Sequence, residues 1–107
     1  MEVECFKIRL KPGTLPLVRE WAARLNSEMS EVKKLLQNEG MALESVFLEQ
    51  GPEGDSLVYY LRSPDLKRTR EVSRASQHAI DVFHREVMQQ ISAGGARLEC
   101  LLDASTE

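Results

Sequence analysis

Two histidines and one acid carry the strongest signal for proton chemistry in this sequence of 107 residues. His78 and His84 are its only histidines, and Asp81 lies midway between them. On an unbroken helix, steps of three residues place these side chains within one sector of about 120°. Asp81 would then orient one imidazole, and an imidazole with a pKa of about 6.5 suits acid–base catalysis at neutral pH. A structural alternative stays open: if the helix bends near Gln77, Asp81 or Ser76 simply caps its second half.

His84 is the better placed of the two histidines for catalysis. It lies four residues after Ile80 and four before Met88, beside the apolar stripe of its helix, so its ring is expected to point partly inward. Two phenols are candidate catalytic partners, Tyr59 and Tyr60. Because neighbours on a strand point to opposite faces, one of them faces the helices and the other faces away. We take His84 as the acid/base, Asp81 as its orienting group and the inward tyrosine as an assisting phenol.

Trp21 and His78 are the candidate ligand contacts. Trp21 also fits a plain core position on the first helix. We expect no metal site, because helical metal pairs favour a spacing of four residues and no third strong ligand accompanies the histidines. The sequence has no glycine-rich phosphate loop, and no cofactor is predicted.

The elements that must position these residues follow from periodicity and turn chemistry. The sequence predicts one domain over residues 1–107, a ferredoxin-like βαββαβ α+β sandwich, with a four-stranded antiparallel sheet in the order 4-1-3-2 and the helices on one face. Gly40 is the expected end of the first helix. Gly94 and Gly95 are read as the end of the second, which should bend within residues 73–77. The predicted elements are strands at 3–10, 41–50, 56–62 and 97–103, and helices at 14–38 and 63–92.

The sheet face that the helices leave uncovered is apolar, and this predicts a partner. Two helices cover only one side, and an uncovered outer face is normally polar at alternate positions. The third strand is instead apolar on both sides, from Leu57 to Leu61. An apolar face of ~600 Å² left in water would forgo roughly 15 kcal/mol. We therefore expect a homodimer through the sheet face, since twofold self-association is the commonest oligomer.

Composition narrows the class of protein further. A net charge of −3 disfavours nucleic acid as a partner, and the basic stretch Arg62 to Arg74 is interpreted as a solvated helix face. The longest apolar run has five residues, where a membrane span needs ~20, and the first residues do not resemble a secretory signal. The protein is therefore expected in the cytoplasm and away from membranes. There Cys5 and Cys100 are predicted to be buried, reduced thiols.

Four stretches carry a resemblance to a known family: Val3–Gly13, Glu20–Ala22, Glu44–Glu49 and Ser76–His84. The sequence resembles an uncharacterised bacterial family of the dimeric α/β-barrel superfamily, which also holds antibiotic-biosynthesis-type monooxygenases, sugar mutarotases and haem-degrading enzymes. The resemblance implies a dimer with facing sheets and a ligand pocket between each sheet and its own helices. It implies no established reaction. The haem-degrading relatives place an asparagine on the first strand, which this sequence lacks.

Two classes of function remain. The first is a cofactor-free small-molecule enzyme of isomerase, mutarotase or monooxygenase type that uses His84. The second is a non-catalytic module that binds a small molecule or only assembles. An open cleft that reaches His84 would favour the enzyme, and a space filled by side chains would favour the module.

Overall fold

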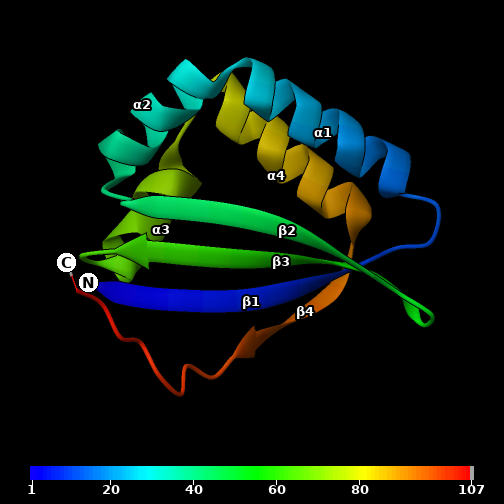
Figure 1. Cartoon of the computed structure of the whole chain (residues 1–107). Helices are drawn as coiled ribbons and strands as arrows, with labels where there is room; N and C mark the ends of the chain where they lie inside the picture. The colour runs from blue at the N-terminus through cyan, green and yellow to red at the C-terminus, as the bar shows by residue number, and fades with distance from the viewer. Residues whose placement is uncertain (107) are drawn as a thin grey trace.

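The protein, in a computed structural model that describes residues 1–106, is a sheet with helices layered on one side (Figure 1). In chain order the elements are β1 (Glu2–Leu10), α1 (Leu15–Ser27), α2 (Met29–Glu39), β2 (Leu43–Gly51), β3 (Gly54–Ser63), α3 (Leu66–Ala75), α4 (Ala79–Ile91) and β4 (Ser92–Leu98). The sheet has the order β2-β3-β1-β4 with antiparallel pairs throughout. This confirms the predicted ferredoxin-like fold, because 2-3-1-4 is the order 4-1-3-2 seen from the other edge.

The core lies between the helices and the inner face of the sheet. Leu57, Tyr59 and Leu61 of β3 point toward the helices and are each less than a tenth exposed. They contact the buried faces of α1 and α4, which include Trp21 and Ile91. The alternation predicted for β3 therefore assigns Tyr59 to the inner face and Tyr60 to the outer face.

The outer face of the sheet, opposite the helices, carries large apolar side chains in contact with solvent. Phe47 is 61% exposed, Leu98 42% and Leu43 41%. In the register, Phe47 lies opposite Val58, and Val58 lies opposite Lys7. Apart from these residues the outer face includes Val3, Cys5, Arg9, Tyr60 and Arg62.

Each predicted long helix is divided in two. The first predicted helix breaks at Glu28, within residues 26–30, where the apolar repeat is interrupted. There the side chains of Asn26 and Ser27 donate hydrogen bonds back to the carbonyls of Ala22 and Arg24, which competes with the helical ladder.

The second division confirms the predicted bend. Helix α3 ends at Ala75 and α4 begins at Ala79. The cap is a residue we did not assign to that role: His78 Nδ1 accepts a hydrogen bond of 3.1 Å from the Ile80 N–H. His78, Asp81 and His84 therefore do not share one continuous helix.

The prediction for the last strand is wrong. We placed it at 97–103 because Gly94 and Gly95 suggested a helix end, whereas β4 begins directly after α4 and contains both glycines. Gly95 passes so close to β1 that an added Cβ would lie 2.7 Å from the Lys7 carbonyl oxygen. Gly95 thus allows close strand approach beside a register shift in β1, and Gly94 adopts a φ of 115°; neither glycine ends the helix.

The position of β4 earlier in the chain than predicted also changes the environment of Cys100. Cys100 lies beyond β4 and is exposed, so the prediction that it is buried is wrong. Cys5 is half-buried on the outer face, and both thiols are free. None of the helices within residues 1–106 is long and apolar enough to cross a bilayer.

Candidate functional site

A cavity of about 560 Å³ lies between the inner face of the sheet and the helices. This volume is within the range of ~300–1,000 Å³ typical of small-molecule sites. Its wall is mostly apolar, with Phe6, Trp21 and Tyr59 among the aromatic side chains. A few ionisable groups reach it from the helices and from β2; they include Glu39, Glu44, Asp81 and His84.

His84 is held in one orientation by the indole of Trp21. The Trp21 Nε1–H donates a hydrogen bond of 3.1 Å to His84 Nδ1, and the ring centroids lie 5.5 Å apart. An indole nitrogen only donates, so Nδ1 must accept and a neutral His84 carries its proton on Nε2. Burial lowers the pKa of His84, and the opposing charge of Asp81 does not reverse this direction. At neutral pH His84 is therefore an uncharged donor.

Asp81 lies one helical turn before His84 and lines the same cavity. Among the hydrogen bonds of residues 1–106, none joins Asp81 to His84. The bond that orients the ring comes instead from Trp21, 63 positions away in the sequence. Asp81 acts on the site through its charge, which raises the pKa of His84, Glu39 and Glu44.

Tyr59 forms part of the cavity wall between Phe6 and His84. Its ring stacks on Phe6 with centroids 4.8 Å apart and meets His84 edge-on at 6.4 Å. Its hydroxyl donates to the Met88 sulfur at 3.4 Å. Burial, with the nearby charge of Glu44, raises the pKa of this phenol above its usual range. Tyr59 therefore stays neutral and supplies a rigid aromatic surface with a hydroxyl at its end.

Tyr60 and His78 lie outside this cavity. Tyr60 is on the outer face, where its hydroxyl accepts a hydrogen bond of 3.0 Å from Arg62 Nε. His78 is exposed at the start of α4, with Nε2 3.7 Å from a Glu31 carboxylate oxygen. Of the six residues that the sequence singled out, the cavity brings together His84, Asp81, Tyr59 and Trp21 and leaves these two apart.

Glu39 and Glu44 are cavity residues that sequence reasoning missed. Glu39 ends α2 and Glu44 is the second residue of β2, and the turn through Gly40 (φ 76°) brings both to the same end of the cavity. Burial, with the charges of Glu44 and Asp81, raises the pKa of Glu39 to about 7. Burial and Asp81 also raise the pKa of Glu44. The sequence could have identified Glu44 but not Glu39, because Glu44 alternates in phase with Val46 and Leu48 on the inward side of its strand.

Glu4 is a buried carboxyl on the inner face, and its surroundings differ from those of Glu39 and Glu44. Glu4 forms ion pairs with Arg70 and with Arg97, the latter at 3.3 Å. Within the described chain, no ion pair involves Glu39 or Glu44. Glu4 is therefore a neutralised structural carboxylate, whereas burial and neighbouring carboxylates raise the pKa of both Glu39 and Glu44. No group of three or more His, Cys, Asp or Glu side chains in residues 1–106 could hold a metal ion.

The fold and the cavity define the class: a ferredoxin-like α+β protein with a small-molecule-sized pocket between its sheet and its helices. The chain matches the Family of unknown function (DUF6176) over residues 1–107, and it belongs to that family. No curated protein matches it significantly in sequence.

Solved structures share this fold at low sequence identity. An L-rhamnose mutarotase from Formosa agariphila has a TM-score of 0.64 and 20% identity, covering 98% of this chain and 100% of its own. An antibiotic biosynthesis monooxygenase has a TM-score of 0.62 and 19% identity, covering 98% and 99%. A NIPSNAP domain protein from Burkholderia xenovorans has a TM-score of 0.58 and 18% identity, covering 97% and 96%. At such identities the likeness establishes the fold alone, and function must be argued from the site.

Proposed function

We propose that this protein is a cytoplasmic, cofactor-free enzyme of isomerase or mutarotase type that moves a proton on a small polyhydroxylated molecule in the cavity. The observation that carries the proposal is the cavity itself, an apolar hollow into which a neutral imidazole and poorly neutralised carboxyls converge. A core built only for stability would fill this space, because cavities lower stability. Ionisable groups with perturbed pKa values in a cleft are the usual mark of a reactive site.

In this proposal Glu39 carries the proton. A general acid–base works best when its pKa lies near the working pH, and the pKa of Glu39 is about 7. In mutarotation, its carboxylate accepts the proton of the anomeric hydroxyl while the ring carbon–oxygen bond breaks. Glu39 then gives this proton to the former ring oxygen, which leaves an open-chain carbonyl compound. On closure Glu39 takes the proton of the attacking hydroxyl and gives it to the carbonyl oxygen, and attack on the other face of the carbonyl yields the second anomer.

His84 assists as a donor. Its Nδ1 accepts from Trp21, so its Nε2–H donates a hydrogen bond to the ring oxygen while negative charge develops there. A second proton on Nδ1 would face the indole N–H, and this disfavours the imidazolium form. His84 therefore polarises the substrate, and the charge of Asp81 helps to bring the pKa of Glu39 close to neutral pH, where the carboxyl can both accept and give up a proton.

The test is anomer exchange measured by NMR saturation transfer on a panel of aldoses. We expect exchange above the spontaneous rate for at least one sugar, lost by ~100-fold or more in Glu39→Gln and reduced in His84→Gln. The matched control is Glu86→Gln, which removes an exposed carboxylate from α4. No acceleration for any sugar, or full activity in Glu39→Gln, rejects this mechanism. Binding of a sugar without exchange would favour the non-catalytic module.

We also propose that the enzyme is a homodimer in which the outer faces of two sheets cover each other. The large apolar side chains there, led by Phe47 at 61% exposure, support this. A contiguous exposed apolar patch on a small protein generally marks an interaction site. The twofold arrangement places each cavity on the far side of its sheet from the interface, so assembly leaves both cavities accessible.

A further inference from the structure

Helix α2 covers one end of the cavity without belonging to the core. Figure 1 shows it above the end of the sheet where β2 begins. Its side chains Val32, Leu35 and Leu36 line the cavity, yet no residue of α2 is fully buried. Each of the other three helices has at least two buried residues. Within the described chain, neither the core nor the partly buried residues packed against it include a residue of α2.

The two ends of α2 are hinge points beside well-anchored chain. At the first, Glu28 leaves helical geometry (φ −112°, ψ 33°). Its carboxylate accepts a hydrogen bond of 3.1 Å from Arg24, whose guanidinium lies 4.2 Å from the ring centroid of Phe83 on α4. At the second, Gly40 adopts a φ of 76°, and its carbonyl accepts a hydrogen bond of 3.2 Å from buried Ser63 of β3. Rotation at these two residues therefore moves α2 while its neighbours stay in place.

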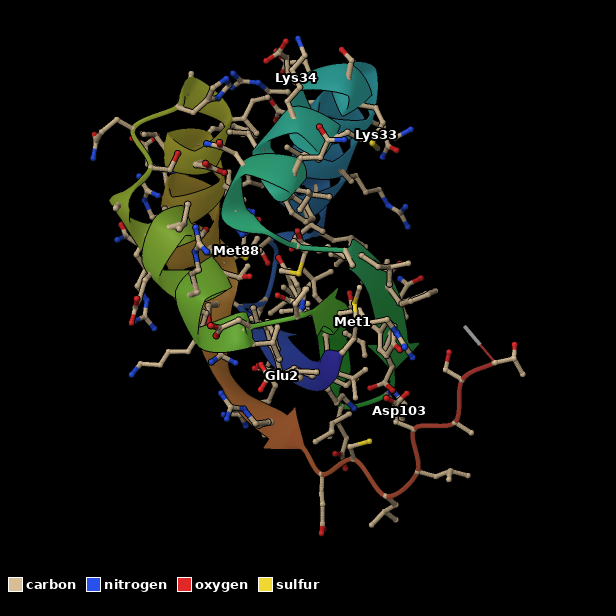
Figure 2. All side chains as sticks on the ribbon, turned by 90° about the vertical axis from the view of Figure 1, so that its left-hand side faces the viewer. Met1, Glu2, Lys33, Lys34, Met88 and Asp103 are labelled. Atoms are coloured by element: carbon tan, nitrogen blue, oxygen red, sulfur yellow. The ribbon has the colours of Figure 1, made fainter. Side chains whose placement is uncertain are left out.

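The contact between α2 and α4 is a weak tether. Glu31 lies 3.7 Å from Nε2 of His78, the N-cap of α4, and both side chains are more than a third exposed. The same Glu31 carboxylate also accepts a hydrogen bond of 3.2 Å from Lys34 of its own helix. Figure 2 shows Lys33 and Lys34 on the solvent side of α2. An ionic contact at this exposure contributes little to stability, so the tether opens easily.

The inner part of the cavity is shielded from solvent. Trp21 and Tyr59 line it, yet they are only 4% and 3% exposed. A ligand of the size that the cavity holds therefore reaches them only when part of the cover moves. Local opening favours segments with few buried apolar contacts, and among the four helices α2 is that segment.

We propose that α2 is a lid that admits a small molecule to the cavity and, on closing, turns Glu39 toward it. The inference rests on the proposed function, in which Glu39 carries the proton. Glu39 is the last residue of α2, whereas His84 belongs to α4. Because Glu39 adjoins Gly40, rotation at this hinge turns its carboxyl out of the cavity. The acid–base group is therefore complete only in the closed state, which also excludes water from the reaction.

The first experiment is amide hydrogen exchange of the wild-type chain, resolved by residue with NMR, over a series of low urea concentrations. Amides of α2 should have protection factors at least ~10-fold lower than those of α1 and α4, because the lid opens without global unfolding. Urea should hardly change the exchange of α2 and should accelerate that of α1 and α4, whose exchange requires the core to unfold. Equal protection and equal urea dependence of the three helices overturn the lid.

The second experiment measures access to the cavity by acrylamide quenching of Trp21, the one tryptophan of the sequence. Acrylamide is a small neutral molecule that must enter the cavity to reach the indole. Glu31→Ala removes the contact with His78 and should raise the quenching constant ~2-fold or more, because the open state becomes more populated. Glu20→Ala makes the same change at an exposed position of α1 and should leave quenching unchanged. Equal quenching in Glu31→Ala and wild type overturns α2 as the route of entry.

Both experiments are independent of the proposed reaction, since neither uses a sugar. Local opening of α2 and increased quenching in Glu31→Ala, without anomer exchange for any sugar, would support the lid and reject the enzyme. Anomer exchange in a protein whose three helices are equally protected would reject the lid and keep the enzyme.

Discussion

Replacing Glu39 by Gln should stabilise the protein above pH 7 and have little effect at pH 4.5 or below. The folded state raises the pKa of Glu39 from 4.5 to about 7, first through burial and then through the charges of Glu44 and Asp81. Between these values the folded chain binds more protons than the unfolded chain, so stability falls as pH rises. The contribution is fully present below pH 4.5 and is lost as pH passes about 7.

The magnitude follows from that pKa difference. Each pKa unit corresponds to about 1.4 kcal/mol, so the full effect would be ~3.4 kcal/mol at high pH. The Glu39 side chain keeps some contact with solvent, which screens the interaction, and we expect ~1–2 kcal/mol. For a chain of this length that is a rise in Tm of about 4 °C or more.

The assay is urea unfolding at pH 5, 6, 7 and 8, at one protein concentration because the chain is proposed to dimerise. The stability difference between Glu39→Gln and wild type should increase with pH, while Glu86→Gln should show no such trend. In a Glu44→Gln background the trend should shrink, because one of the repelling charges is gone. A difference that is the same at pH 5 and pH 8 would refute the assignment of Glu39 as a half-buried carboxyl with a raised pKa.

Three further predictions concern the ring, the sheet face and the thiols. Trp21→Phe should raise the pKa of His84 in an NMR titration, because the indole N–H stabilises only the neutral ring. The exposed His78 serves as the internal reference. An unchanged or lowered pKa of His84 would contradict the proposed orientation of its ring. Val58→Glu should convert the dimer to a monomer of half the mass in sedimentation, whereas Gln90→Glu should not. Thiol titration of the unfolded protein without reductant should find two free sulfhydryls, Cys5 and Cys100, and finding none would show a disulfide.

The fold could be predicted because its signals are local. Apolar residues repeat at two or at three and four positions, and glycine and proline mark the turns. These signals predict the order of the strands in the sheet and the bend after Ala75. They failed at β4, because glycines that end a helix and glycines that allow close strand approach look the same in sequence. Only the Lys7 carbonyl on β1 distinguishes the two cases at Gly95.

The candidate site was only partly predictable, because its decisive contacts are distant in sequence. The pattern of α4 favours His84, but its hydrogen-bond partner Trp21 lies on α1, and no sequence pattern connects the two residues. Glu39 looks like any exposed acid near a helix end. Its unusual pKa arises from Glu44 and Asp81, which come from two other elements and meet it only in the folded chain.

The divided helices explain why this sandwich has room for a ligand. A continuous helix over residues 14–38 would be ~37 Å long at 1.5 Å per residue, longer than a nine-residue strand at ~30 Å, and would lie along the sheet and pack against it. The break at Glu28 and the one after Ala75 instead let four shorter helices arch over the sheet (Figure 1). The end of the arch at α2, where none of the residues is fully buried, is where Glu39 and Glu44 enter the cavity. The polar stretches that weaken both helical patterns in the sequence are therefore the local cause of the hollow. Burial of Glu39 at its edge, with the charges of Glu44 and Asp81, then raises the pKa on which the proposed proton transfer depends.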